Sequence, residues 1–151
     1  MKVLVFTIGA DRYGLALGAI ARVLPAARLR QLPLAPSCVA GLMDLHGEPV
    51  PVIDLSRLAG VPPKGGWFDT RIILIDYTHG DGVRPLGLMA EHVLGVETID
   101  GGALADSGVA AAPFLGQVAA TGAGMLQLVE LDQLLAPEVR ALLFSSCEAG
   151  P

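Results

Sequence analysis

Long apolar stretches, cysteines and basic residues are all scarce in this chain of 151 residues. No apolar run approaches the roughly 20 residues that a membrane-spanning helix needs, and the first residues lack the features of a signal peptide. We therefore expect a cytoplasmic protein. Its two cysteines, Cys38 and Cys147, are too far apart to form a metal or redox motif. We expect both to remain unpaired thiols in a reducing cytosol.

Catalytic and cofactor-binding motifs are also missing. The chain has no G-x-S-x-G nucleophile elbow, no P-loop and no G-x-G-x-x-G after a predicted strand. Its three histidines include no pair at metal-ligand spacing. Asp44 and His46 would share one face of an extended strand, and Glu91 and His92 could in principle join them. We expect no metal, cofactor or catalysis, and keep a small metal-dependent hydrolase as the alternative from another class.

The charges are divided unevenly along the chain. Residues 1–75 carry a net charge of +3 and residues 76–151 carry −8, which gives −5 overall. Arginines cluster only at Arg22, Arg28 and Arg30. A nucleic-acid-binding protein would need a broad basic face, so this class is excluded. The asymmetry either steers association with a partner or with further copies of the chain, or is a solvated surface without a role.

Glycine and proline are frequent, with 19 and 11 residues, and 52% of the residues are hydrophobic. Short strands at intervals of roughly eight to twelve residues are typical of barrels and sandwiches. We predict strands over Val3–Ile8, Tyr13–Leu17, Arg28–Leu32, Gly41–Leu45, Glu48–Ile53, Arg71–Tyr77, Val83–Ala90, Val93–Ile99, Phe114–Ala120 and Met125–Leu131. We also predict a crossing at Gly18–Leu24, a surface loop at Asp100–Ala112, and a short helix from Pro137 to about Phe144.

The central prediction is a hairpin within Gly41–Leu55. His46-Gly47 would form its turn, because glycine tolerates the positive φ that a tight hairpin requires. Pro49 and Pro51 both lack an N–H on the same side of the second strand, which places that strand at a sheet edge or a barrel opening. Asp54 would end the strand and cap a short helical turn.

Four motifs in this order resemble the CheW-like family of small bacterial coupling proteins. They cover Leu4 to about Leu135 and read VFTIGADRYGLAL, LRQLPLAPSCVAGLMDLHGEPVPVIDL, RIILIDY with PLGLMAEHVLGV, and FLGQVAATGAGMLQLVELDQLL. The longest motif keeps the family's glycine, proline, aspartate and leucine positions, including Gly41, Gly47, Pro51 and Asp54. Each motif alone has little specificity, whereas their order and spacing together are specific.

The resemblance implies a mainly β fold of two packed, small, five-stranded β-barrel subdomains with a short C-terminal helix. We predict one domain over residues 1–144, followed by a tail at 145–151. The prolines and glycines of Val61–Asp69 predict a loop near 60–70 that joins the two halves. The resemblance also implies a non-catalytic adaptor that bridges a chemoreceptor's cytoplasmic tip to the regulatory domain of a CheA-type histidine kinase. That kinase domain is homologous, so kinases and coupling proteins can alternate in rings.

The resemblance also suggests contact residues. Ile20, Val23 and Leu24 match the wall of the family's receptor groove, with Gly41 and His46-Gly47 as further interface candidates. Ordinary core positions are the competing interpretation of the first three. His46 replaces the arginine that family members carry in this turn, so a bidentate contact to a receptor acid is lost. Two alternatives remain within the family: an adaptor of a non-flagellar pathway, such as pilus motility or cyclic-nucleotide output, and a relative that assembles only with itself.

Overall fold

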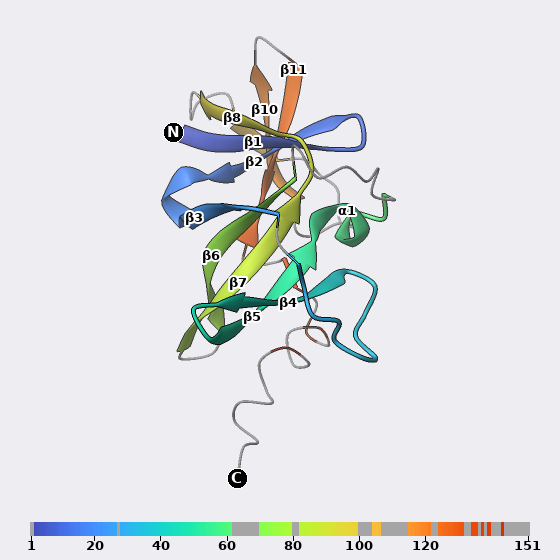
Figure 1. Ribbon diagram of the computed structural model, residues 1–151. Coiled ribbons are helices and arrows are strands. Elements are labelled where there is room, and N and C mark those ends of the chain that lie inside the picture. Colours follow the sequence, from blue (N-terminus) through green and yellow to red (C-terminus); the bar gives the residue numbers. More distant parts are fainter. Residues whose placement is uncertain are drawn as a thin grey trace.

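The computed structural model describes residues 2–26, 28–61, 70–79, 82–99, 104–106, 115–121 and 124–131, and five positions beyond them: 134, 135, 137, 139 and 143. Its strands form two sheets (Figure 1). The six-stranded sheet has the order β8-β1-β2-β11-β10-β9. Its strands are β1 (Lys2–Ile8), β2 (Asp11–Ala16), β8 (Val93–Thr98), β9 (Leu104–Asp106), β10 (Leu115–Thr121) and β11 (Gly124–Val129).

The five-stranded sheet has the order β3-β6-β7-β5-β4. Its strands are β3 (Ile20–Pro25), β4 (Val39–Leu45), β5 (Glu48–Asp54), β6 (Arg71–His79) and β7 (Gly82–Ala90). Two short helices accompany the strands: the 3-10 helix η1 (Leu17–Ala19) lies between β2 and β3, and α1 (Leu55–Leu58) follows β5. In the part of the chain that is described, no helix is long and apolar enough to cross a membrane.

The core has three layers, which follow from the alternation of side chains along the strands. One buried cluster, the shared core, combines residues of both sheets, among them Leu4 and Phe6 of β1 with Ile53, Ile73 and Leu86 of the other sheet. A second cluster lies within the six-stranded sheet and includes Val3 and Leu126. The third lies within the five-stranded sheet and includes Met43, Val50, Val52, Ile72 and Leu74. The predicted mainly β fold of two packed subdomains is therefore confirmed.

The sheets are more open than the two five-stranded barrels of the prediction. Across the described residues, no ladder joins β3 to β4, the two ends of the five-stranded order. The two edges are nevertheless linked: Arg30, which follows β3, exchanges two backbone hydrogen bonds of 2.8 Å with Leu42 of β4. The additional strand of the other sheet is the three-residue β9, which pairs with β10.

The boundary between the sheets differs from the predicted one. The chain passes from the six-stranded to the five-stranded sheet at η1, and it returns at Glu91-His92 between β7 and β8. Residues 62–69 lie outside the described part, but β5 and β6 on either side belong to the same sheet. The loop predicted there therefore stays a prediction, and its prolines and glycines carried no information about which sheet each neighbouring strand joins.

Three local predictions need correction or qualification. Arg28–Leu32 is not a strand; only Arg30 forms an isolated bridge, and the prolines at 25 and 33 limit any longer ladder on either side. The predicted loop Asp100–Ala112 contains β9, which is too short to show a periodic pattern. Of the predicted C-terminal helix, Pro137, Val139 and Leu143 are described and are helical, while the rest, like Cys147 and the tail, lies outside the described residues.

The central hairpin forms as predicted, with one refinement. β4 and β5 pair in register from Gly41↔Val52 to Leu45↔Glu48. β5 is not an edge strand in the sheet order, but it pairs with β7 only from Val52 to Asp54. The first half of β5, with Pro49 and Pro51, therefore has β4 as its only ladder partner among the described strands, which is where prolines without an N–H fit.

Candidate protein-interaction site

Val23 places an exposed apolar side chain on the edge strand β3. Its Cα partner on β6 is Ile73, which is fully buried in the shared core between the sheets. Cross-strand partners project from the same face of a sheet. Val23 therefore lies on the face that is turned towards the six-stranded sheet, yet 45% of its surface is exposed. It marks the outer end of the shared core on this side.

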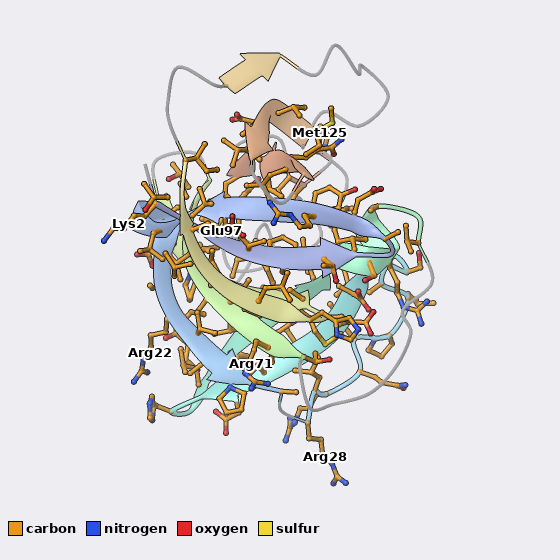
Figure 2. All side chains as sticks on the ribbon, turned by 90° about the horizontal axis from the view of Figure 1, so that it is seen from above. Lys2, Arg22, Arg28, Arg71, Glu97 and Met125 are labelled. Atoms are coloured by element: carbon orange, nitrogen blue, oxygen red, sulfur yellow. The ribbon has the colours of Figure 1, made fainter. Side chains whose placement is uncertain are left out.

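Val96 has the matching position on β8, the edge strand of the other sheet. Its Cα partner on β1 is Leu4, which also belongs to the shared core. Val96 is 52% exposed, so the shared core ends in an exposed valine on this sheet too. We call Val23 and Val96 the inter-sheet margin. Figure 2 shows Lys2, the Cα partner of Thr98 in β8, and Arg22 of β3 projecting from the same side of the molecule.

The other two predicted residues of β3 are directed inwards. Ile20 is partly buried and packs against the shared core. Leu24 pairs with Ile72 and packs against the cluster inside the five-stranded sheet. Both therefore fit the interpretation as core residues, and Val23 alone among the three presents a largely exposed surface.

Sequence reasoning missed the contribution of β8. Leu94 and Val96 are 59% and 52% exposed. The register of β8 with β1 shifts between Val5 and Phe6, and Leu94 has no Cα partner there. The sequence does indicate this exposure, because the run His92–Val96 has apolar residues on both faces of the strand. In an edge strand, at least one of these faces is in contact with water. Recognising it required knowledge that β8 lies at an edge.

The turn of the central hairpin is a second exposed element. His46 has φ 52° and Gly47 has φ 88°, so both central residues have the positive φ of a type I′ turn. The Gly47 amide donates a 2.8 Å hydrogen bond to Asp44 Oδ1, and both turn residues are exposed. The turn joins β4 to β5, whereas the inter-sheet margin is formed by β3 and β8, so the two exposed elements come from different strands.

Gly41, another predicted interface residue, is buried and has a structural role. Its φ is 149°, and a Cβ at this position would collide with the carbonyl oxygen of Arg30 and lie 3.0 Å from the Cβ of Leu29. The glycine permits the close approach that the Arg30–Leu42 bridge requires. Gly41 therefore has a structural role, and the interface role suggested for it stays a prediction.

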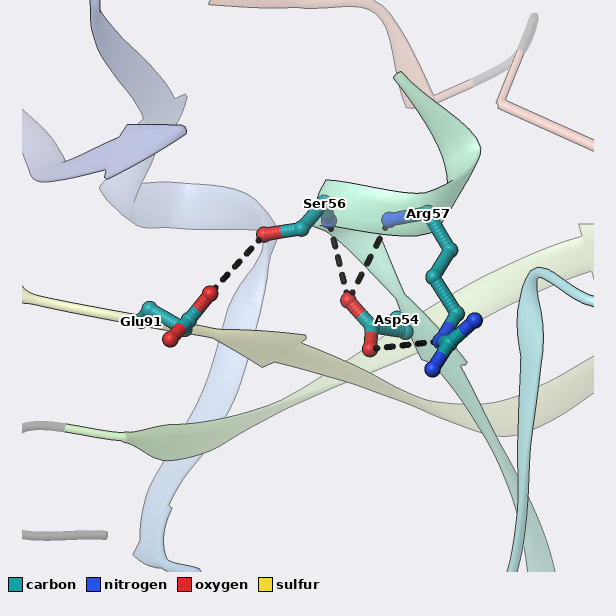
Figure 3. Close-up of polar contacts among 4 residues, drawn as sticks. All are labelled: Asp54, Ser56, Arg57 and Glu91. Carbon is teal, nitrogen blue, oxygen red and sulfur yellow. Dashed lines mark hydrogen bonds and ion pairs between the residues drawn. The ribbon is translucent and has the colours of Figure 1, made fainter. Parts of the chain in front are cut away.

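Asp54 caps α1, as predicted, and Pro51 is buried beside it in β5. The Oδ1 of Asp54 accepts hydrogen bonds from the amides of Ser56 at 3.0 Å and Arg57 at 3.4 Å, and its Oδ2 lies 3.6 Å from Arg57 Nε (Figure 3). Burial raises the pKa of the Asp54 carboxyl, although these amides and Arg57 oppose the shift. The cap thus holds a carboxyl group in an environment that disfavours its charge.

Ser56 extends this cluster to the second crossing between the sheets. Its hydroxyl donates a 3.3 Å hydrogen bond to Glu91 Oε1 (Figure 3). Glu91 precedes β8, and the following His92 has φ 52°. The start of α1 is thereby tied to the segment that leads into the edge strand with Val96.

The polar groups of the site suit structural roles better than chemistry. Within the described ranges, no three His, Cys, Asp or Glu side chains are grouped so that they could hold a metal ion. Asp44, which the hydrolase alternative needs beside His46, accepts the turn hydrogen bond from Gly47. Cys38 is buried and unpaired, and burial raises the pKa of its thiol, so it is a poor nucleophile.

Comparisons with known proteins support the two-sheet fold described above. The family model of the CheW-like domain matches residues 2–138. The chemotaxis protein CheW of Klebsiella aerogenes is 25% identical over 144 residues, which cover 93% of this chain and 84% of that protein. The crystal structure of the scaffolding protein TtCheW from Thermoanaerobacter tengcongensis superposes with a TM-score of 0.81 at 26% identity, covering 91% of this chain and 89% of that one.

Proposed function

Because the chain belongs to the CheW-like domain family, whose members are non-catalytic adaptors, we propose that it couples chemoreceptors to a histidine kinase. In this proposal the cytoplasmic tip of a receptor binds at the inter-sheet margin, and the regulatory domain of a CheA-type kinase binds at the ends of the sheets. The protein acts in the cytoplasm without inserting into the membrane. Residues 1–144 form one adaptor domain, and 145–151 form its tail.

The exposed valines of the inter-sheet margin are the observation that supports receptor binding most directly. A helical segment that docks into a groove needs apolar anchors at its centre and polar groups around them. Val23 and Val96 are apolar, continue the shared core outwards and come from different sheets. A receptor helix seated between β3 and β8 would cover both side chains and thereby extend the shared core.

A reconstitution with purified components tests the proposal. The chain is mixed with the CheA-type kinase and the receptor tip fragments from the same organism, and kinase autophosphorylation is measured with and without the chain. We expect receptor control of the kinase only when the chain is present. An affinity purification from the native cell, with the chain as bait, identifies the receptor and kinase to use. Failure to retain any receptor or kinase there would contradict the proposal.

A further inference from the structure

Four arginines lie on or beside the edge strand β3. Arg22 is in the strand, and Arg28 and Arg30 are in the segment that follows it; all three side chains are exposed. Arg71 at the start of β6 is the Cα partner of Pro25, so it lies next to the end of β3. Figure 2 shows Arg22 and Arg28 pointing outwards from the molecule, with Arg71 lying over the ribbon between them. We call Arg22, Arg28 and Arg30 the basic edge.

Among the described residues, no acid forms an ion pair with the basic edge. The ion pairs found among the described residues are Arg12–Glu97 and Arg57–Asp54, and none involves Arg22, Arg28 or Arg30. The whole chain carries a net charge of −5, so these arginines concentrate positive charge on one edge of an acidic protein. Such a local field attracts a surface of opposite sign and repels one of the same sign.

The apolar and basic features lie on the same strand. Arg22 and Val23 are consecutive in β3, but their side chains leave the strand on opposite faces, because Arg22 pairs with Leu74 and Val23 with Ile73. Since β3 is an edge strand, a partner that covers Val23 and extends over this edge comes within reach of Arg22. Charged groups around an apolar anchor determine partner choice and association rate more than they determine total affinity. Arginine suits this role because its guanidinium group binds a carboxylate through two parallel hydrogen bonds.

We propose that the partner surface that docks along β3 is acidic, and that the basic edge selects it. This inference rests on the proposed function, since it describes the chemistry of the receptor tip that binds at the inter-sheet margin. A nucleic acid is a poor match for the site, because the basic edge is small and the rest of the chain would repel a polyanion. Anionic lipid could also respond to the arginines and is distinguished by the experiment.

The test uses the tip fragment of the receptor that the affinity purification identifies. Its affinity for the chain is measured at about 50 mM and about 300 mM salt. Arg22→Glu/Arg28→Glu should weaken binding roughly tenfold at low salt and flatten the salt dependence. Arg22→Lys/Arg28→Lys keeps the charge and should retain most of the affinity. Arg84→Glu on β7 alters the net charge as much as Arg28→Glu alone, and should change affinity by no more than about twofold.

The outcomes separate this inference from the proposed function. If the tip fragment binds, and Val23→Asp abolishes binding while the Glu variants bind like wild type, the adaptor function stands and the inference is wrong. If no tip fragment binds the wild type, the proposed function fails, and the inference fails with it. Sedimentation with vesicles containing phosphatidylserine is run in parallel. Vesicle binding that is lost in the Glu variants, with receptor affinity unchanged, would also overturn the inference.

Discussion

Arg30 and Leu42 exchange two backbone hydrogen bonds of 2.8 Å, and this pair links the two ends of the five-stranded sheet. The bridge depends on the neighbouring Gly41, because a Cβ there would collide with the Arg30 carbonyl oxygen. The absence of a side chain at Gly41 thus allows the segment after β3 to lie against β4. The segment carries Arg28 and Arg30, so the geometry of the basic edge depends on the same contact.

Gly41→Ala should therefore be strongly destabilising. The added Cβ collides with backbone, and the φ of 149° is unfavourable for any L-residue, so we expect a loss of at least about 2 kcal/mol in the free energy of unfolding. Gly18→Ala is the control, because a Cβ at Gly18 meets nothing within 4 Å. Urea unfolding of both variants measures the difference. Equal stability of the two would show that the close approach at Gly41 is not maintained in solution.

Asp54→Asn should change how stability depends on pH. Burial raises the pKa of Asp54 in the folded protein, so the protonated form is favoured by folding. The stabilisation from this group is complete below the carboxyl's unfolded pKa and is lost as the pH rises through the raised folded pKa. Wild type should therefore lose stability relative to Asp54→Asn as the pH rises from about 4 towards 7.

Thermal unfolding across that pH range measures the effect, and Asp54→Ala provides the control. Asn keeps an oxygen that can accept from the amides of Ser56 and Arg57, whereas Ala removes the cap, so Asp54→Ala should be about 1 kcal/mol less stable than Asp54→Asn at every pH. Parallel curves for wild type and Asp54→Asn would refute the assigned direction of the pKa shift.

His46→Arg should strengthen receptor binding modestly. The resemblance places an arginine in this turn, and the turn is exposed, so the longer cationic side chain can reach an acid on the partner. An exposed charge pair contributes roughly 0.2–1 kcal/mol, which corresponds to an affinity gain of up to about fivefold. Calorimetric titration with the receptor tip fragment measures the gain, and unchanged thermal unfolding serves as the control. Weaker binding would mean that the partner surface has adapted to histidine.

Turn and cap chemistry made much of the fold predictable. His46-Gly47, Asp54 and the prolines of β5 each impose a local backbone requirement, and the structure meets each of them close to the predicted residues. These signals depend on the residue itself and its near neighbours in the chain. For the same reason, most strands began and ended within about two residues of their predicted limits.

Features that depend on distant pairing were not predictable. The role of Gly41 becomes visible only when Arg30 is known to lie against it, and nothing near Gly41 in the sequence indicates this. The exposure of Val96 follows from its pairing with Leu4, more than ninety positions away, and from the edge position of β8. The crossings between the sheets were misplaced because loop composition does not reveal strand order.

The central claim is that receptors control the kinase through the inter-sheet margin. It is tested most directly by a reconstituted kinase assay with variants that place one charge in this margin. Kinase autophosphorylation is measured with receptor tip fragments and either wild type, Val23→Asp or Val96→Asp. Both valines are about half exposed, so the variants should fold, which thermal unfolding verifies. We predict that each aspartate abolishes receptor control while the variant still binds the kinase. Full receptor control with both folded variants would contradict the account.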